Sequence, residues 1–189
     1  MPSDQMTADE LRWNEQAVAA AGAVLSDPVE AATRAEQITT DMAAKQAGVG
    51  GGTRAMAKGG MKLMKGMTKV MPGMGSVRGL DTMRDAGLPG TFLLAVTPTQ
   101  VHAIEVKEKA GADLAAGKVL STWDRAGFQA KRGLDIAAQA QGVPPDRQQI
   151  TLYLPNAKVA QMVPGVGMPT QFMVGRDPAS EALIKALCS

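Results

Sequence analysis

An apolar residue at every seventh position marks the first segment of the chain. Leu11, Val18 and Leu25 lie on one face of a helix at this spacing. Thr7 and Glu10 precede them in a capping-box pattern, in which each side chain accepts a hydrogen bond from the other residue's backbone amide. The pattern predicts a helix that begins just after Thr7.

A second helix-start signal follows at Asp27 and Pro28. Proline is typical of the first helical position, because its missing N–H group needs no partner there. We therefore expect a second helix from Pro28 to about Ala47, so that residues 1–48 form a helical hairpin. The hairpin packs on its own domain or, as the alternative, serves as an arm for homo-oligomerisation.

From Thr91 onward the apolar positions follow the period of two that is typical of β-strands. Asp177 and Pro178 then predict a closing helix, whose apolar face is formed by Leu183, Ile184 and Leu187. Residues 132–142 fit either a short helix or a polar insertion. The predicted strands are 91–97, 101–107, 118–124, 127–131, 149–155, 158–163 and 170–174.

This order of elements resembles the pleckstrin-homology-like (PH-like) fold in its small bacterial form. The resemblance rests on TFLLAVTPTQVHAIEVK, KVLSTWDR and the alternating ITLYLP before the closing helix, and it covers about residues 90–188. It implies a bent, seven-stranded antiparallel barrel plugged by the C-terminal helix, and a binding platform rather than a catalyst. The first loop, Pro98-Thr99-Gln100, lacks the Lys and Arg residues with which eukaryotic members bind phosphoinositides. Another small barrel is the alternative.

Charge divides the chain into three parts. Residues 1–48 contain eight acidic and three basic residues, residues 49–80 contain six basic and no acidic residues, and the net charge is +2. Four of the five residues 48–52 are glycine, which predicts a hinge. We therefore expect an α+β protein with an acidic helical hairpin (1–48), a Gly-rich hinge and basic Met-rich segment (49–89), and a PH-like β-barrel domain (90–189).

The basic segment separates into two faces when residues 54–71 are placed on a helix. Three glycines at positions 59, 60 and 66 each cost about 1 kcal/mol relative to alanine in a helix, so we expect this amphipathic helix to form on contact with a partner. The basic face consists of Arg54, Lys58, Lys62, Lys65 and Lys69, and the apolar face of Met56, Leu63, Met64, Met67, Val70 and Met71.

A basic face opposite an apolar face fits an anionic membrane surface, near which each basic residue contributes about 1 kcal/mol. The same pattern fits the groove of an acidic protein partner. Methionines at helical spacing are also typical of a core, so the alternative is a self-contained structural or small-ligand-carrying barrel protein in which this segment is packed as core. Nucleic acid ranks below these partners, because the segment lacks aromatic residues for base stacking.

The composition favours a cytoplasmic protein with at most peripheral membrane association. The single cysteine, Cys188, excludes an internal disulfide, and no apolar run reaches the roughly 18 residues of a membrane span. His102 is the only histidine, and on a strand it shares a face with Ile104 and Val106, as a core or boundary imidazole does. We predict a binding or adaptor protein that is not an enzyme, with no catalytic residues, cofactor or metal.

Overall fold

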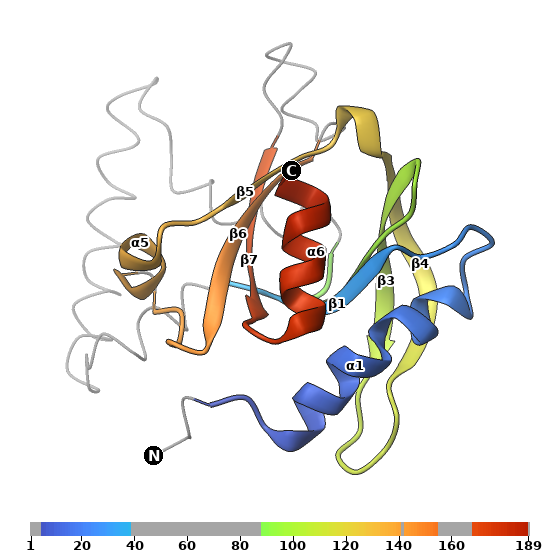
Figure 1. Cartoon of the computed structure of the whole chain (residues 1–189), viewed down its shortest axis with the longest axis horizontal. Helices are drawn as coiled ribbons and strands as arrows, with labels where there is room; N and C mark the ends of the chain where they lie inside the picture. Colours follow the sequence, from blue (N-terminus) through green and yellow to red (C-terminus); the bar gives the residue numbers. More distant parts are fainter. Residues whose placement is uncertain (1–4, 39–87, 141, 155–167, 189) are drawn as a thin grey trace, which may run out of the picture.

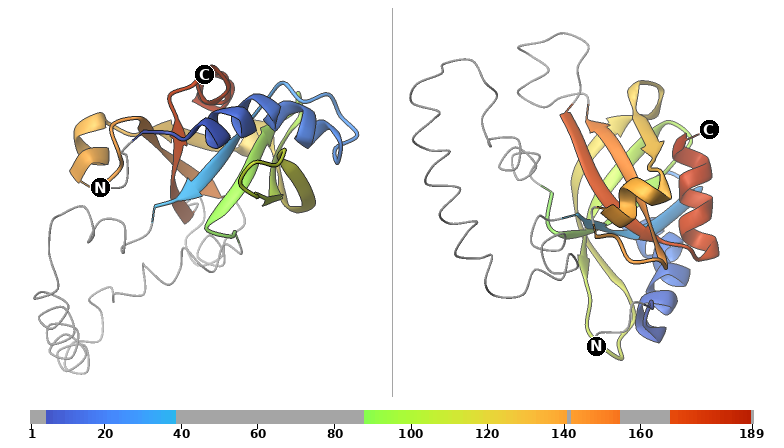
Figure 2. Two further views of the ribbon diagram at one scale, coloured as in Figure 1. Left: turned by 90° about the horizontal axis from the view of Figure 1, so that it is seen from below. Right: turned by 90° about the vertical axis from the view of Figure 1, so that its left-hand side faces the viewer.

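A computed structural model describes residues 5–38, 88–140, 142–154 and 168–188, which form an α+β fold (Figures 1 and 2). Seven antiparallel strands make one sheet in the order β4-β3-β2-β1-β7-β6-β5. The strands are β1 (Ala31–Gln37), β2 (Thr91–Val96), β3 (Gln100–Lys107), β4 (Ala115–Asp124), β5 (Gln129–Arg132), β6 (Arg147–Leu154) and β7 (Met168–Gly175). The helices are α1 (Ala8–Gly22), α5 (Asp135–Ala140), α6 (Pro178–Cys188) and the 3-10 turn η2 (Arg125–Gly127).

Of the three predicted helix starts, those at Thr7 and Asp177 are confirmed, whereas no helix begins at Pro28. The Thr7 hydroxyl accepts a hydrogen bond from the Glu10 amide at 3.2 Å, and the Thr7 amide donates to the Glu10 carboxylate at 2.7 Å. At the start of α6, the Asp177 carboxylate accepts from the Ser180 amide at 3.2 Å. These local contacts satisfy amides that have no partner inside the helix.

The predicted second helix is wrong over residues 31–37, which form β1 in the middle of the sheet. Its sequence, AATRAEQ, is rich in residues that favour a helix, but tertiary packing overrides this preference. Ala31, Ala32 and Ala35 are buried between β2 and β7, with α1 and α6 packed on the strand. The rest of the predicted helix lies outside the described residues.

Six of the predicted strand ranges overlap observed strands, which are β2 to β7. The seventh range, 158–163, lies outside the described residues. The count of seven strands is instead completed by β1, which pairs with β2 along most of its length. The segment 132–142, left open by the sequence, contains the short helix α5.

The predicted barrel is wrong in its closure, because the sheet is open between its edge strands β4 and β5. These two strands follow each other through η2, where the Trp123 and Phe128 rings meet with centroids 5.7 Å apart. Their backbones form no ladder with each other, so the turn makes a corner rather than a closed ring. The sheet curves around α6 (Figure 1), which buries Leu183, Ile184 and Leu187 as predicted.

The core has two main clusters on opposite faces of the central strands. On β2, Phe92, Leu94 and Val96 belong to the cluster with α6, whereas the alternating Leu93 and Ala95 belong to the cluster with α1. This alternation follows from the two-residue period of a strand. The sheet around β2 is therefore buried on both faces.

Side-chain contacts also hold α1 to the connection between β3 and β4. The Trp13 indole N–H and the Arg12 guanidinium both donate to the Ala112 carbonyl, at 2.9 and 2.7 Å. The Gln16 side-chain oxygen accepts from the Leu114 amide at 2.8 Å. These bonds fix the position of α1 beside the end of β3.

Candidate functional site

The eleven residues predicted to contact a membrane or partner all lie between positions 54 and 71, outside the described residues. What the structure describes is where the chain leaves the sheet and where it returns. The Gln37 amide donates to the Gly90 carbonyl at 2.7 Å, and Glu36 pairs with Thr91 in the ladder between β1 and β2. Residues 39–87 therefore connect two neighbouring antiparallel strands.

A second connection, residues 155–167, begins close to the first. It joins Leu154 to Met168, which are paired in the ladder between β6 and β7. The Ile38 amide donates to the Gln171 carbonyl at 3.1 Å, so the end of β1 lies against the first half of β7. Both connections thus start from neighbouring parts of the sheet.

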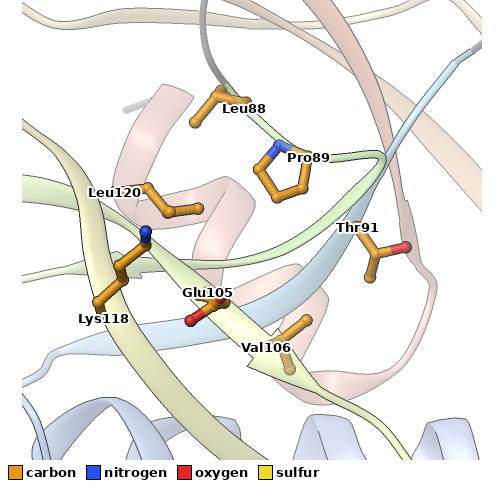
Figure 3. A pocket seen from close by; sticks show the side chains of 7 residues that line it. All are labelled: Leu88, Pro89, Thr91, Glu105, Val106, Lys118 and Leu120. Carbon is orange, nitrogen blue, oxygen red and sulfur yellow. The ribbon is translucent and has the colours of Figure 1, made fainter.

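A cavity of about 550 Å³ opens beside the point where the chain returns to the sheet (Figure 3). It is formed by the start of β2, the end of β3 and the first half of β4. Figure 3 shows Leu88, Pro89 and Leu120 gathered on one side, with Glu105 and Val106 facing them. The described residues that line it are Leu88, Pro89, Thr91, Glu105, Val106, Lys118 and Leu120.

Two opposite charges border this cavity. Glu105 of β3 is half-buried and Lys118 of β4 is exposed. Within the described part of the chain, neither side chain forms a hydrogen bond or an ion pair. Both charges are therefore available to a ligand.

Gly117 leaves the space that the Glu105 side chain occupies. A Cβ atom at position 117 would lie 2.5 Å from the Glu105 Oε2 atom and 3.0 Å from its Cβ atom. Real Cβ atoms do not approach other atoms so closely, so a larger residue would displace the carboxylate. Glycine at this position thus fits the placement of Glu105 along the cavity wall.

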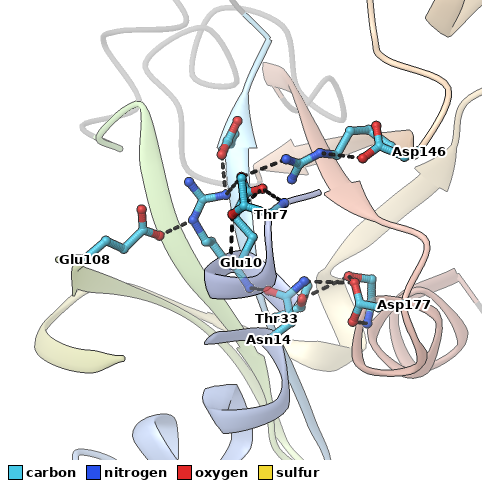
Figure 4. Close-up of polar contacts among 11 residues, drawn as sticks. Thr7, Glu10, Asn14, Thr33, Glu108, Asp146 and Asp177 are labelled. Carbon is cyan, nitrogen blue, oxygen red and sulfur yellow. Dashed lines mark hydrogen bonds and ion pairs between the residues drawn. The ribbon is translucent and has the colours of Figure 1, made fainter. Parts of the chain in front are cut away.

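A second group of charges surrounds Arg34 of β1 where α1 meets the sheet. Figure 4 labels two of its carboxylates, Glu10 and Glu108. The Arg34 guanidinium forms ion pairs with Glu36 and Glu108 and lies 3.5 Å from the Glu10 carboxylate. Arg147, at the start of β6, donates to the same Glu10 carboxylate at 2.7 Å. The Arg34 side chain is only 10% exposed, so these partners replace water around it.

Burial and pairing act in opposite directions on the pKa values in this Arg34 cluster. Burial raises the pKa of Glu10, but hydrogen bonds from Arg147 and the Thr7 amide and the nearby guanidinium charges outweigh it, so the pKa is lowered. Burial lowers the pKa of Arg34, but the hydrogen bond to Glu108 and the charges of the surrounding glutamates raise it above its ordinary value. The cluster favours the charged forms.

A hydrogen-bonded chain next to this cluster joins α1, β1 and α6. The Asn14 side-chain amide donates to the Asp177 carboxylate at 2.8 Å, and its oxygen accepts from the Arg34 amide at 3.3 Å. The Ser180 hydroxyl donates to the same Asp177 carboxylate at 2.8 Å and lies 3.0 Å from the Thr33 hydroxyl. Polar groups here serve the packing of the two helices on the sheet.

His102 is a buried imidazole, as the sequence predicted. Its ring is 6% exposed, and Nδ1 lies 3.0 Å from the Thr122 hydroxyl on β4. Burial lowers the pKa of His102, and the charge of Asp27 opposes this effect. Among the residues that the structure describes, no group of His, Cys, Asp or Glu side chains could hold a metal ion.

The sequence did not identify the cavity or the Arg34 cluster. A signal for the cavity is present in VHAIEVK, where Glu105 continues the face of Val101 and Ala103 that turns toward the core. A carboxylate at the next core-facing position of a strand indicates either a buried ion pair or a site. The sequence alone does not show which charge on the neighbouring strand lies nearby.

Comparison of the chain with known protein families, with curated proteins and with solved structures finds no match. In the described residues, no helix has the length and apolar character needed to cross a membrane.

Proposed function

We propose that this protein is a non-enzymatic binding or adaptor module that uses the basic amphipathic segment 54–71 to contact an anionic membrane surface. The observation that supports this most directly is the hydrogen bond between Gln37 and Gly90. Because these residues are neighbours, the sheet holds both ends of the 39–87 connection at one place. Long connections of this kind cost the fold little, since the entropy of loop closure grows only slowly with length.

The charge pattern of segment 54–71 indicates which kind of partner it binds. Four lysines on one face of the segment, with methionines opposite, fit phosphate headgroups and acyl chains at once. An acidic protein partner offers similar chemistry and is the second class of ligand for the same residues. The PH-like resemblance, in which such domains serve as binding platforms, belongs to the same proposal.

A non-catalytic role is consistent with how the carboxylates of the Arg34 cluster are used. Glu10, Glu36 and Glu108 surround Arg34 and are held in ion pairs. A general acid or base needs a carboxylate that can exchange its proton with a substrate. Glu10 instead joins α1 to the sheet through Arg34. Glu36 and Glu108 pair with Arg34 on the sheet itself.

Co-sedimentation with vesicles tests the proposal. Anionic and neutral vesicles are compared for the wild type and for the variant K58Q/K62Q/K65Q/K69Q. If each of the four lysines contributes about 1 kcal/mol, the variant should bind anionic vesicles on the order of 1,000-fold more weakly. The matched control changes four exposed lysines of the described part of the chain, as K107Q/K109Q/K131Q/K185Q, and should keep most of the binding. Equal binding of the wild type to both kinds of vesicle, or to neither, contradicts the proposal.

The alternative is a self-contained structural or ligand-carrying protein in which the Met-rich segment is packed as core. The observation that favours it is the cavity of about 550 Å³, with Leu88, Val106 and Leu120 in its lining. Limited trypsin digestion distinguishes the two functions. Rapid cleavage between Lys58 and Lys69 supports an exposed segment, whereas resistance equal to that of the sheet supports the alternative.

A further inference from the structure

The cavity beside β2, β3 and β4 is open to solvent, and its volume is that of a small-molecule site. Its volume of about 550 Å³ lies within the range of about 300 to 1,000 Å³ that is typical of ligand pockets. Leu88, Leu120 and Val106 give it aliphatic walls, and Thr91 adds a hydroxyl group. Such walls favour a ligand with an aliphatic part.

The two charged side chains restrict the ligand further. Glu105 and Lys118 lie on neighbouring strands, and no ion pair joins them to each other or to other side chains in the described part of the chain. A carboxylate without a protein partner can form a charge-assisted hydrogen bond with a ligand that supplies an ammonium group. A purely cationic ligand would be repelled by Lys118, and a purely anionic one by Glu105. A ligand with both charges is attracted by both residues.

We propose that this cavity binds a small zwitterion with an aliphatic part. The ligand's ammonium group pairs with Glu105, its anionic group pairs with Lys118, and its aliphatic part contacts Leu88 and Leu120. Two sources carry this chemistry, namely a free aliphatic amino acid and the headgroup and first acyl carbons of an ethanolamine phospholipid. The inference does not depend on membrane binding by residues 54–71.

Calorimetric titration of the full chain tests this with a matched series of probes. Leucine carries both charges, 3-methylbutylamine lacks its carboxylate, and 4-methylpentanoate lacks its ammonium group. We expect leucine to bind at least tenfold more tightly than either single-charge analogue. Dihexanoyl phosphatidylethanolamine, below its micellar concentration, distinguishes the lipid source. Tight binding of either zwitterion supports the shared chemistry and identifies the source.

Two variants test whether Glu105 pairs with the ligand's ammonium group and Lys118 with its anionic group. E105Q should lower leucine affinity at least tenfold and remove the advantage of leucine over 4-methylpentanoate. K118Q should also lower leucine affinity at least tenfold, and it should remove the advantage of leucine over 3-methylbutylamine. The controls E15Q and K109Q change exposed residues away from the cavity and should leave affinity unchanged.

Methyl NMR spectra show whether each variant is folded and whether ligand shifts centre on Leu88 and Leu120. The inference is overturned if neither zwitterion binds, if a single-charge analogue binds as tightly as the tighter-binding zwitterion, or if folded E105Q and K118Q both bind that zwitterion like the wild type. Shifts centred elsewhere in the molecule would also overturn it.

Discussion

The Arg34 cluster and the cavity are two charged regions of the same sheet, and they differ in how their charges are paired. In the cluster, the nearly buried Arg34 has three carboxylates around it. At the cavity, Glu105 and Lys118 have no partner within the described residues. The cluster joins elements that are far apart in sequence, whereas the cavity charges join none. The difference separates charges that stabilise the fold from charges that are free to bind a ligand.

The largest expected effect comes from breaking the cluster. Arg34→Met should lower the free energy of unfolding by about 3 kcal/mol, because it leaves partly buried carboxylates without their cation. Denaturant unfolding measures the loss. Arg176→Met is the matched control, since Arg176 pairs with Asp135 at the exposed surface and should cost less than about 1 kcal/mol. Equal losses in the two variants would mean that the cluster is not a special source of stability.

A smaller effect is expected where the cavity wall is tightest. Gly117→Ala should destabilise by about 1 kcal/mol, because the new methyl group collides with the Glu105 side chain. The double variant Gly117→Ala/Glu105→Ala should recover the loss in thermal unfolding. Gly22→Ala, with no atom within 4 Å of the new Cβ, should be neutral or stabilising. Failure of the double variant to recover would contradict the placement of Glu105 over Gly117.

Acid should weaken the fold through two separate groups. The pKa of Glu10 is lowered in the folded state, so its stabilisation is present above its ordinary pKa of 4.5 and is lost as the pH falls through the lower folded value. The pKa of His102 is also lowered, so its contribution is lost as the pH falls below the ordinary value of 6.5. Glu10→Gln should flatten the stability profile below pH 4.5, and His102→Gln should flatten it just below pH 6.5. Urea unfolding across this range measures both, and an unchanged profile in either variant would contradict that assignment.

The smallest expected effect is at the cavity charges themselves. Glu105→Gln and Lys118→Gln should each change the free energy of unfolding by less than about 0.5 kcal/mol, as is usual for side chains without partners. Denaturant unfolding of these two variants and of Arg34→Met, under the same conditions, compares their free energies of unfolding. A loss above 1 kcal/mol in either variant would show that the charge is structural, and the contrast between the two regions would disappear.

The sequence predicted those helices and strands whose signals, such as caps and strand-like runs, lie within a single segment. The capping box at Thr7 and the Asp177 cap gave the starts of α1 and α6. Runs rich in β-branched residues gave β2 and β3, and clean alternation gave β6. β1 was missed because its short alanine side chains favour a helix and only the neighbouring strands make it extended. The open edge was missed because closure depends on the register of β4 and β5, which no single segment encodes.

The candidate site was less predictable, for a related reason. Strand β3 pairs with β4 through two irregularities, between Ala103 and Ile104 and between Ile104 and Val106. Each irregularity shifts the partner of the following residue, so counting along the sequence does not bring Glu105 and Lys118 to one cavity. The predicted basic segment lies outside the described residues, and its role stays a prediction.

The hydrogen bond between Gln37 and Gly90 also has a mechanical consequence. A force that draws the two ends of the 39–87 connection apart would act on β1 and β2 from the same end of their ladder. Strands loaded in this way peel apart one rung at a time, whereas strands loaded from opposite ends must break many rungs together. We therefore expect β1 and β2 to separate at low force when residues 38 and 88 are drawn apart, with the first rupture at the hydrogen bond between Gln37 and Gly90.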